Sequence, residues 1–175
     1  MSPLNLEYLI HILQEYVRHT GLSVDLLLVG GLALQAYGLT DRMTRDVDGE
    51  LTGELDSLVE FLHARHIPAD LGENMSGWSV VAMPPGYRER TTVFYQDAGI
   101  RLRLLDPVDF VIAKLRRGME IDLDDAEYVM KKFNLAVSDI QQAAERAIAA
   151  SPKDTALFVF KKVVEAFCYR MRTPP

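Results

Sequence analysis

Hydrophobic residues recur along this chain with two different spacings. Residues 5–19 carry apolar side chains three and four positions apart, which predicts a helix with one buried face. The run 24–30 is apolar and stops at glycine, as expected for a strand buried inside a sheet. The same criteria predict these elements up to residue 105: helices at 32–37 and 54–66, and strands at 46–51, 77–83, 91–96 and 100–105.

The last two of these strands are predicted to form a hairpin. They are separated by Asp97–Gly99, a sequence typical of a tight turn. In the strand 100–105, leucines alternate with Arg101 and Arg103, as on a strand with one buried and one solvent-facing side.

The remainder of the chain is predicted to be helical. Asp106 and Pro107 form an N-cap followed by proline at the first helical position, and further helices are expected at 122–133 and 137–150. A last helix follows the cap sequence 151–154, and its apolar stripe is interpreted as core or as a subunit contact. We therefore expect an α/β core over residues 1–105 and a helical region over 106–175 packed on it.

Composition and charge indicate which partners and which cellular compartment to expect. The chain has 175 residues, 49% of them hydrophobic, and a net charge of −6, which argues against a surface that grips nucleic acid throughout. Cys168 is the single cysteine, so no internal disulfide can form. No apolar run approaches the ~20 residues of a membrane span, and the N-terminus lacks the pattern of a secretory leader. We expect a cytoplasmic protein with no membrane partner.

The stretch 26–51 carries the candidate chemistry, beginning with Gly30 and Gly31. Two glycines after a strand let backbone N–H groups approach an anion closely, and a helix is predicted to follow them. On its own this feature is weak evidence, because many strand-to-helix turns use glycine only for geometry.

Asp46 and Asp48 are the second feature of the stretch. On a strand, residues two positions apart project from the same face, so both carboxylates could share a divalent metal. The alternative is an ordinary exposed pair of acids. Two like charges on one face repel, so a cation is expected beside them, either a metal ion or the side chain of Arg42 or Arg45.

Taken together, these residues resemble a known superfamily. The order Gly-Gly-X-Ala-Leu, a gap, then Arg-X-Thr-X-Asp-X-Asp is similar to the nucleotidyltransferases that include DNA polymerase β, tRNA nucleotidyltransferases and the minimal nucleotidyltransferases of prokaryotes. It is most similar to the small branch related to the abortive-infection (AbiEii-type) nucleotidyltransferase toxins and to uncharacterised nucleotidyltransferase-like proteins. The matching residues are Gly30, Gly31, Ala33, Leu34, Arg42, Thr44, Asp46 and Asp48.

That branch has a second signature, a proline-capped helix with a lysine followed by an acidic segment. Residues 106–129 resemble it, so the resemblance covers about residues 24–133. It implies a mixed β-sheet flanked by helices, with a C-terminal helical bundle. The residues that match the second signature are Pro107, Asp109, Lys114, Arg117, Asp122 and Asp125.

The resemblance also implies an activity, the transfer of a nucleoside monophosphate from an NTP to a hydroxyl of an RNA, a protein or a small molecule. Asp46 and Asp48 would be the catalytic carboxylates and would hold Mg²⁺ or Mn²⁺. The nucleotide would be bound by Gly30, Gly31, Arg42, Thr44, Lys114 and Arg117. For Lys114, a solvated lysine on an amphipathic helix is an equal alternative.

One part of the superfamily pattern is missing, a third carboxylate on a later strand. The strands predicted after residue 77 have no acid in their middle, and only Glu89 and Asp97 flank one of them. A catalytically degenerate nucleotide-binding or regulatory module, such as an antitoxin, is therefore the alternative function. A cognate toxin or antitoxin and a second copy of the chain are the macromolecular partners to consider.

Overall fold

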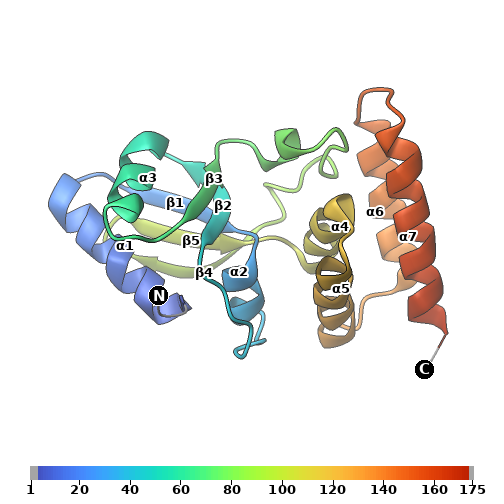
Figure 1. The fold of residues 1–175 in the computed structure, drawn as a ribbon, viewed down its shortest axis with the longest axis horizontal. Helices are drawn as coiled ribbons and strands as arrows, with labels where there is room; N and C mark the ends of the chain where they lie inside the picture. Colours follow the sequence, from blue (N-terminus) through green and yellow to red (C-terminus); the bar gives the residue numbers. More distant parts are fainter. Residues whose placement is uncertain (1–3, 174–175) are drawn as a thin grey trace. The chain divides into compact units, whose positions relative to one another are not determined.

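A five-stranded mixed sheet organises the N-terminal part of the chain in the computed structural model, which describes residues 4–173 (Figure 1). The strand order is β3-β2-β1-β5-β4, with β1 antiparallel to β2 and parallel to β5. The strands are β1 (Val24–Leu28), β2 (Val47–Thr52), β3 (Ala69–Gly72), β4 (Thr92–Asp97) and β5 (Ile100–Leu104).

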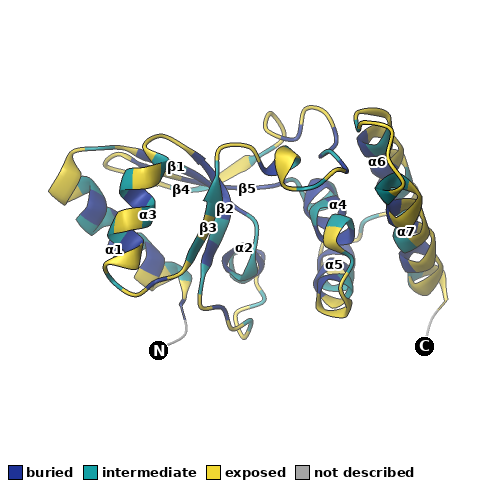
Figure 2. Cartoon of the chain, turned by 45° about the horizontal axis from the view of Figure 1, so that its top comes forward, coloured by how far each residue is buried: buried dark blue, intermediate teal, exposed yellow. Residues whose placement is uncertain are grey.

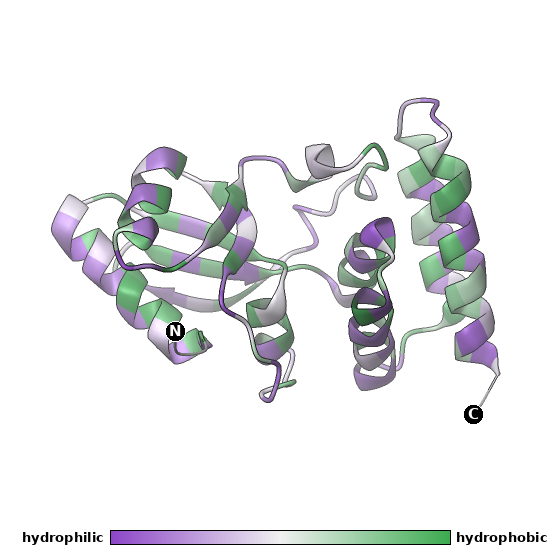
Figure 3. Ribbon diagram, viewed as in Figure 1, coloured by the Kyte–Doolittle hydropathy of each residue, from purple (hydrophilic) through white to green (hydrophobic). Residues whose placement is uncertain are grey.

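The register of the strands gives the sheet one apolar and one polar face. Asp25 pairs with Arg101, Leu27 with Glu50, and residues in register project to the same side. One side of the sheet, the apolar face, is buried along β1, β2 and β5, and Figure 3 shows the alternation along the strands. Its residues include Val24, Leu26, Leu28, Val47, Leu51, Ile100, Leu102 and Leu104. The opposite side, the polar face, carries Asp25, Leu27, Asp48, Glu50, Asp70, Arg101 and Arg103.

Helices α1 (Leu6–Thr20) and α3 (Leu55–His63) lie side by side in Figures 1 and 2. The rings of Tyr16 and Phe61 meet edge to face with centroids 5.2 Å apart, and the Tyr16 hydroxyl is 3.0 Å from the Ser57 hydroxyl. The buried residues of the two helices are apolar apart from that hydroxyl. Burying them against the apolar face of the sheet provides the core of this part of the chain.

The chain divides into two compact units by its contacts. The sheet unit comprises the residues up to Met75 together with Thr91–Leu104, and the helical unit comprises Ser76–Arg90 and the residues from Leu105 onward. The helices of the second unit are α4 (Pro107–Arg117), α5 (Glu120–Lys132), α6 (Val137–Ala149) and α7 (Ala156–Arg172). As predicted, the Asp106 carboxylate caps α4 by accepting the Val108 N–H at 2.9 Å.

The strand predicted at 77–83 is wrong. Those residues form the end of a 3₁₀ turn, η1 (Met75–Trp78), and then an irregular segment. Side chains rather than a neighbouring strand satisfy the backbone there: Arg116 Nε donates to the Val81 carbonyl at 2.7 Å, and Ser151 Oγ accepts the Ala82 N–H at 2.8 Å. Burial lowers the pKa of Arg116 to about 10, so the guanidinium remains charged at neutral pH.

The expectation that Arg103 faces solvent is also wrong. Its side chain is 11% exposed, and its Nε donates to Asp25 at 2.6 Å, while Nη1 lies 3.3 Å from the Thr91 hydroxyl. Arg101, on the same face of β5, stays half exposed, so the difference lies in the local contacts of Arg103. A buried arginine needs an acidic partner, and Asp25 of the neighbouring strand β1 supplies it.

Two further features lie outside the sheet. Cys168 is a free, buried thiol on α7, and burial raises its pKa. Among residues 4–173, no helix combines the length and the apolar character needed to cross a membrane.

Candidate functional site

The glycine turn after β1 lies directly against Asp48 on β2. A Cβ added to Gly30 would stand 1.9 Å from Oδ2 of Asp48 and 2.7 Å from its Cγ. Any side chain at this position would therefore displace the carboxylate. The Val29 N–H also donates to the Asp48 carbonyl at 3.1 Å, which fixes the turn against the start of β2. Gly30 and Asp48, 18 positions apart in the sequence, thus belong to one site.

Gly31 makes the same kind of close approach to Thr44. A Cβ on Gly31 would lie 2.7 Å from Cβ of Thr44. The buried Thr44 hydroxyl donates to Oδ1 of Asp46 at 2.7 Å and so orients that carboxylate. Asp46 stands one residue before β2, whereas Asp48 lies within the strand. The structure therefore brings together Gly30, Gly31, Thr44, Asp46 and Asp48, as the sequence motif predicts.

The loop that carries Arg42 and Thr44 follows α2 (Gly31–Ala36) and is held by one amide side chain. Gln35 Nε2 donates to the Arg42 carbonyl at 2.8 Å and to the Leu4 carbonyl at 3.2 Å. The Leu4 N–H in turn donates to the Thr44 carbonyl at 2.9 Å. Arg42 is half-buried in this loop, next to the acidic pair in sequence. These contacts fix the backbone on both sides of the arginine.

Two acids on the polar face, Asp70 and Glu50, were not predicted from the sequence. Asp70 on β3 is in register with Asp48 on β2, and its side chain is exposed. Because in-register residues of neighbouring strands project to the same face, Asp70 lies beside Asp48. A four-residue strand is too short for its periodicity to be recognised, so the sequence signal was weak. Glu50 follows Asp48 on the same face, is 1% exposed, and accepts the Met75 N–H at 2.8 Å.

Lys114 and Arg117 belong to the helical unit and engage two acids of α5. Lys114 Nζ lies 2.8 Å from Asp125 and 3.3 Å from Asp122, with only 10% of its side chain exposed. Arg117 donates twice to Asp122 at 2.7 Å. Burial of Asp122 would raise its pKa, but the hydrogen bonds from Arg117 and Lys114 outweigh this and lower it. Both basic side chains therefore have acidic partners within the helical unit, without a bound nucleotide.

Glu89 and Asp97, the acids considered as a third carboxylate, are both exposed. Asp97 ends β4 and is followed by Ala98 and Gly99, both with positive φ, so it is a hairpin residue as expected. Glu89 belongs to the helical unit, in the segment Ser76–Arg90. In that segment Arg90 forms a bidentate pair with the buried Asp109, at 2.8 and 2.9 Å.

The donor set at the glycine turn suits a magnesium ion bound together with phosphates. In the part of the chain that the structure describes, no three His, Cys, Asp or Glu side chains gather as a metal cluster. Mg²⁺ does not require one, since it commonly uses one or two carboxylates and completes its octahedron with water and substrate phosphates. The half-buried carboxylates of Asp46 and Asp48, close to the glycine turn, are oxygen ligands of the kind this arrangement uses.

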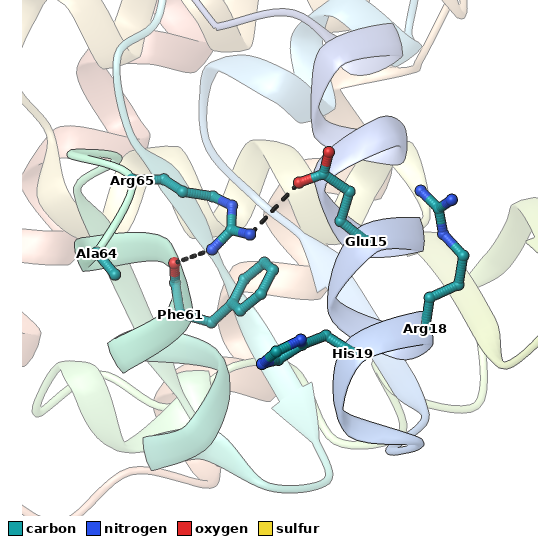
Figure 4. Close-up of a pocket in the computed structure, with 6 residues that line it drawn as sticks. All are labelled: Glu15, Arg18, His19, Phe61, Ala64 and Arg65. Carbon is teal, nitrogen blue, oxygen red and sulfur yellow. Dashed lines mark hydrogen bonds and ion pairs between the residues drawn. The ribbon is translucent and has the colours of Figure 1, made fainter.

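An open groove with a volume of about 670 Å³ lies elsewhere in the sheet unit, between α1 and α3 (Figure 4). Glu15, Arg18 and His19 line it from α1, and Phe61 and Arg65 from the region of α3. The Arg65 guanidinium stacks 3.5 Å over the Phe61 ring and approaches Glu15 at 3.4 Å. The acidic site lies on the polar face of the sheet, so this groove is a separate feature.

Comparison with known proteins gives one family and one solved structure. No curated protein matches the chain. A crystal structure of an antigenic nucleotidyltransferase-like protein from Paracoccidioides brasiliensis matches with a TM-score of 0.49 and 16% identity, over 90% of this chain and 100% of that one. Residues 5–164 match the family described as nucleotidyltransferase of unknown function (DUF6036). Because this match spans most of the chain and includes every residue of the glycine and aspartate motif, the protein belongs to that nucleotidyltransferase family.

Proposed function

We propose that this protein binds an NTP together with Mg²⁺ or Mn²⁺ at Asp46 and Asp48 and transfers its nucleoside monophosphate to an acceptor hydroxyl. The observation that supports this most strongly is the contact between Gly30 and Asp48. The Asp48 carboxylate occupies the position that a Cβ of residue 30 would take. The backbone at Gly30 and the proposed metal-binding oxygen of Asp48 therefore lie next to each other. Phosphoryl transfer needs both, because it relies on positioning and charge neutralisation.

Each residue of the site has a definite task in this proposal. The turn at Gly30 and Gly31 offers backbone N–H groups to the triphosphate, and the Thr44 hydroxyl holds the Asp46 carboxylate in one orientation. A divalent cation on the two aspartates would neutralise charge on the phosphates. Arg42 adds positive charge next to the acids in sequence. The contacts of Lys114 and Arg117 favour a structural role for that pair instead.

The register of Asp48 with Asp70 supports a further assignment, with Asp70 acting on the acceptor hydroxyl. A general base must reach the proton that it removes, and an exposed carboxylate beside the metal-binding acid can turn toward an incoming acceptor. An RNA, a protein or a small molecule could supply that hydroxyl, and the similarity to AbiEii-type proteins suggests a role in a toxin–antitoxin pair.

The test is transfer of label from α-labelled NTPs to a cell extract, run with Mg²⁺ and with Mn²⁺. We expect labelling by the wild type and a loss of at least about 100-fold in Asp46→Asn/Asp48→Asn, as for removal of groups that stabilise a transition state. Asp97→Asn removes an exposed acid of the same unit and serves as the matched control. Equal labelling by the double variant would refute the site.

The alternative is a family member that binds nucleotide without transferring it. It is favoured by the composition of the site, because among the described residues no third acid gathers with Asp46 and Asp48 into a metal cluster. Calorimetry separates the two functions. NTP binding that needs Asp46 and Asp48, without label transfer to any extract, would support the binding module, and Asp70→Asn would then leave binding unchanged.

A further inference from the structure

Helix α7 exposes two aromatic rings on the side opposite to the stripe buried within the helical unit. Phe160, Val164 and Phe167 face inward, and α7 packs on α6 and α4. Phe158 and Tyr169 point the other way and are 66% and 72% exposed, and Val159 is 61% exposed. Figure 2 shows this exposed side along α7. Two exposed rings that share one face of a helix are candidate contact points for a partner.

The outer stripe has charges at its centre and aromatic rings at its ends. Along the helix the residues Phe158, Lys162, Glu165 and Tyr169 are spaced by four, three and four positions, which places them on one face. Lys162 Nζ and Glu165 Oε2 are 2.8 Å apart, and both side chains are at least half exposed. Phe158 thus lies four positions before Lys162, and Tyr169 lies four positions after Glu165.

This order is self-complementary. When two copies of α7 run antiparallel about a two-fold axis between Lys162 and Glu165, each lysine faces the glutamate of the other copy. Each Phe158 then faces Tyr169 of the other copy, with the ring pair four residues beyond the ion pair. This pairing of Phe158 with Tyr169 and of Lys162 with Glu165 is what a second, antiparallel copy requires. An unrelated partner would not require it.

We propose that the outer stripe of α7 binds the same stripe of a second copy of this chain, forming an antiparallel homodimer. The proposal is independent of the nucleotidyl transfer proposed above, because it rests on the helical unit alone. The two ion pairs set the register and the aromatic pairs bury apolar surface at each end.

Sedimentation equilibrium of the full chain over a range of concentrations tests the assembly. We expect a monomer–dimer equilibrium whose dissociation constant rises by about tenfold or more in Lys162→Glu, because four acids then meet at the axis. The charge swap Lys162→Glu/Glu165→Lys should return it to within about threefold of the wild type. Lys153→Glu, an exposed reversal in the turn before α7, is the control and should change nothing.

A cysteine pair tests the register independently of charge. In a Cys168→Ser background, Phe158→Cys/Tyr169→Cys should form a covalent dimer on oxidation, whereas Phe158→Cys alone should not. Within one helix the two positions are 11 residues or about 16 Å apart, too far for an internal disulfide. A monomer at every concentration, no rescue by the charge swap, or equal crosslinking by the single variant would each overturn the proposal.

Discussion

Gly30 shows how one missing Cβ decides the local chemistry. Its φ of −84° is not left-handed, so the glycine is not required by a positive φ. It is required because Asp48 occupies the volume in which a Cβ would stand. At this residue, then, close approach to the Asp48 carboxylate gives a reason for the glycine that the sequence alone did not supply.

Gly30→Ala should therefore damage the site more than the fold. We expect a loss of about 1–3 kcal/mol in the free energy of unfolding, from overpacking against Asp48, and about a 100-fold loss of label transfer, since the carboxylate must move. Urea denaturation and the labelling assay measure the two effects.

Gly21→Ala is the comparison for this variant. Gly21 caps α1 at φ 71° with nothing within 4 Å of a Cβ, so alanine there costs about 1 kcal/mol through backbone strain but should leave transfer intact. If both variants lost transfer equally, the loss would reflect stability and not the displaced carboxylate.

At the scale of elements, the α4–α5 pair is held together by buried charge. Lys114 on α4 lies between Asp122 and Asp125 of α5, and Arg117 covers Asp122 from the last turn of α4. Asp122 also accepts the Met119 N–H at 3.3 Å, so it caps its own helix. The lysine and the acids thus connect α4 to α5 across the turn at Gly118, where φ is 65°.

Lys114→Met should lower the free energy of unfolding by about 3–5 kcal/mol, because it takes the lysine ammonium away from the buried charge of Asp125. The double variant Lys114→Met/Asp125→Asn removes that charge and should recover a large part of the loss. Chemical denaturation measures both. A stable Lys114→Met protein that had lost only NTP binding would instead support the nucleotide-binding role that the superfamily resemblance implies.

At the scale of the whole molecule, acid should destabilise the protein through Asp122. Its pKa in the folded chain is lowered from 3.8, so the ionised carboxylate stabilises the fold. This contribution is complete above the unfolded-state pKa near 4 and is lost as pH falls through the lower folded-state value.

Thermal unfolding of the wild type and of Asp122→Asn, measured from pH 7 to pH 2, checks this expectation. The wild type should be more stable at neutral pH, and the difference should narrow below about pH 4 as Asp122 becomes protonated. Glu145→Gln, which changes an exposed acid of α6, is the control. A difference between wild type and Asp122→Asn that stayed constant over this range would contradict the assignment.

Local sequence determined a large part of the fold. The helices from Leu105 onward, the hairpin at Asp97–Gly99 and the strand that ends before Gly30 follow from periodicity, caps and turn residues, all of which act over a few positions. The motif that carries the family resemblance could also be recognised from the sequence, because its glycines and acids lie within 19 residues of one another.

Tertiary structure alone decided three other features. Arg103 is buried against Asp25 of the neighbouring strand β1, and residues 77–83 form no strand because Arg116 and Ser151 satisfy their backbone. Asp70 stands beside Asp48 through the register of β3. In each case the deciding contact joins residues more than 20 positions apart, a distance over which hydrophobic periodicity carries no information.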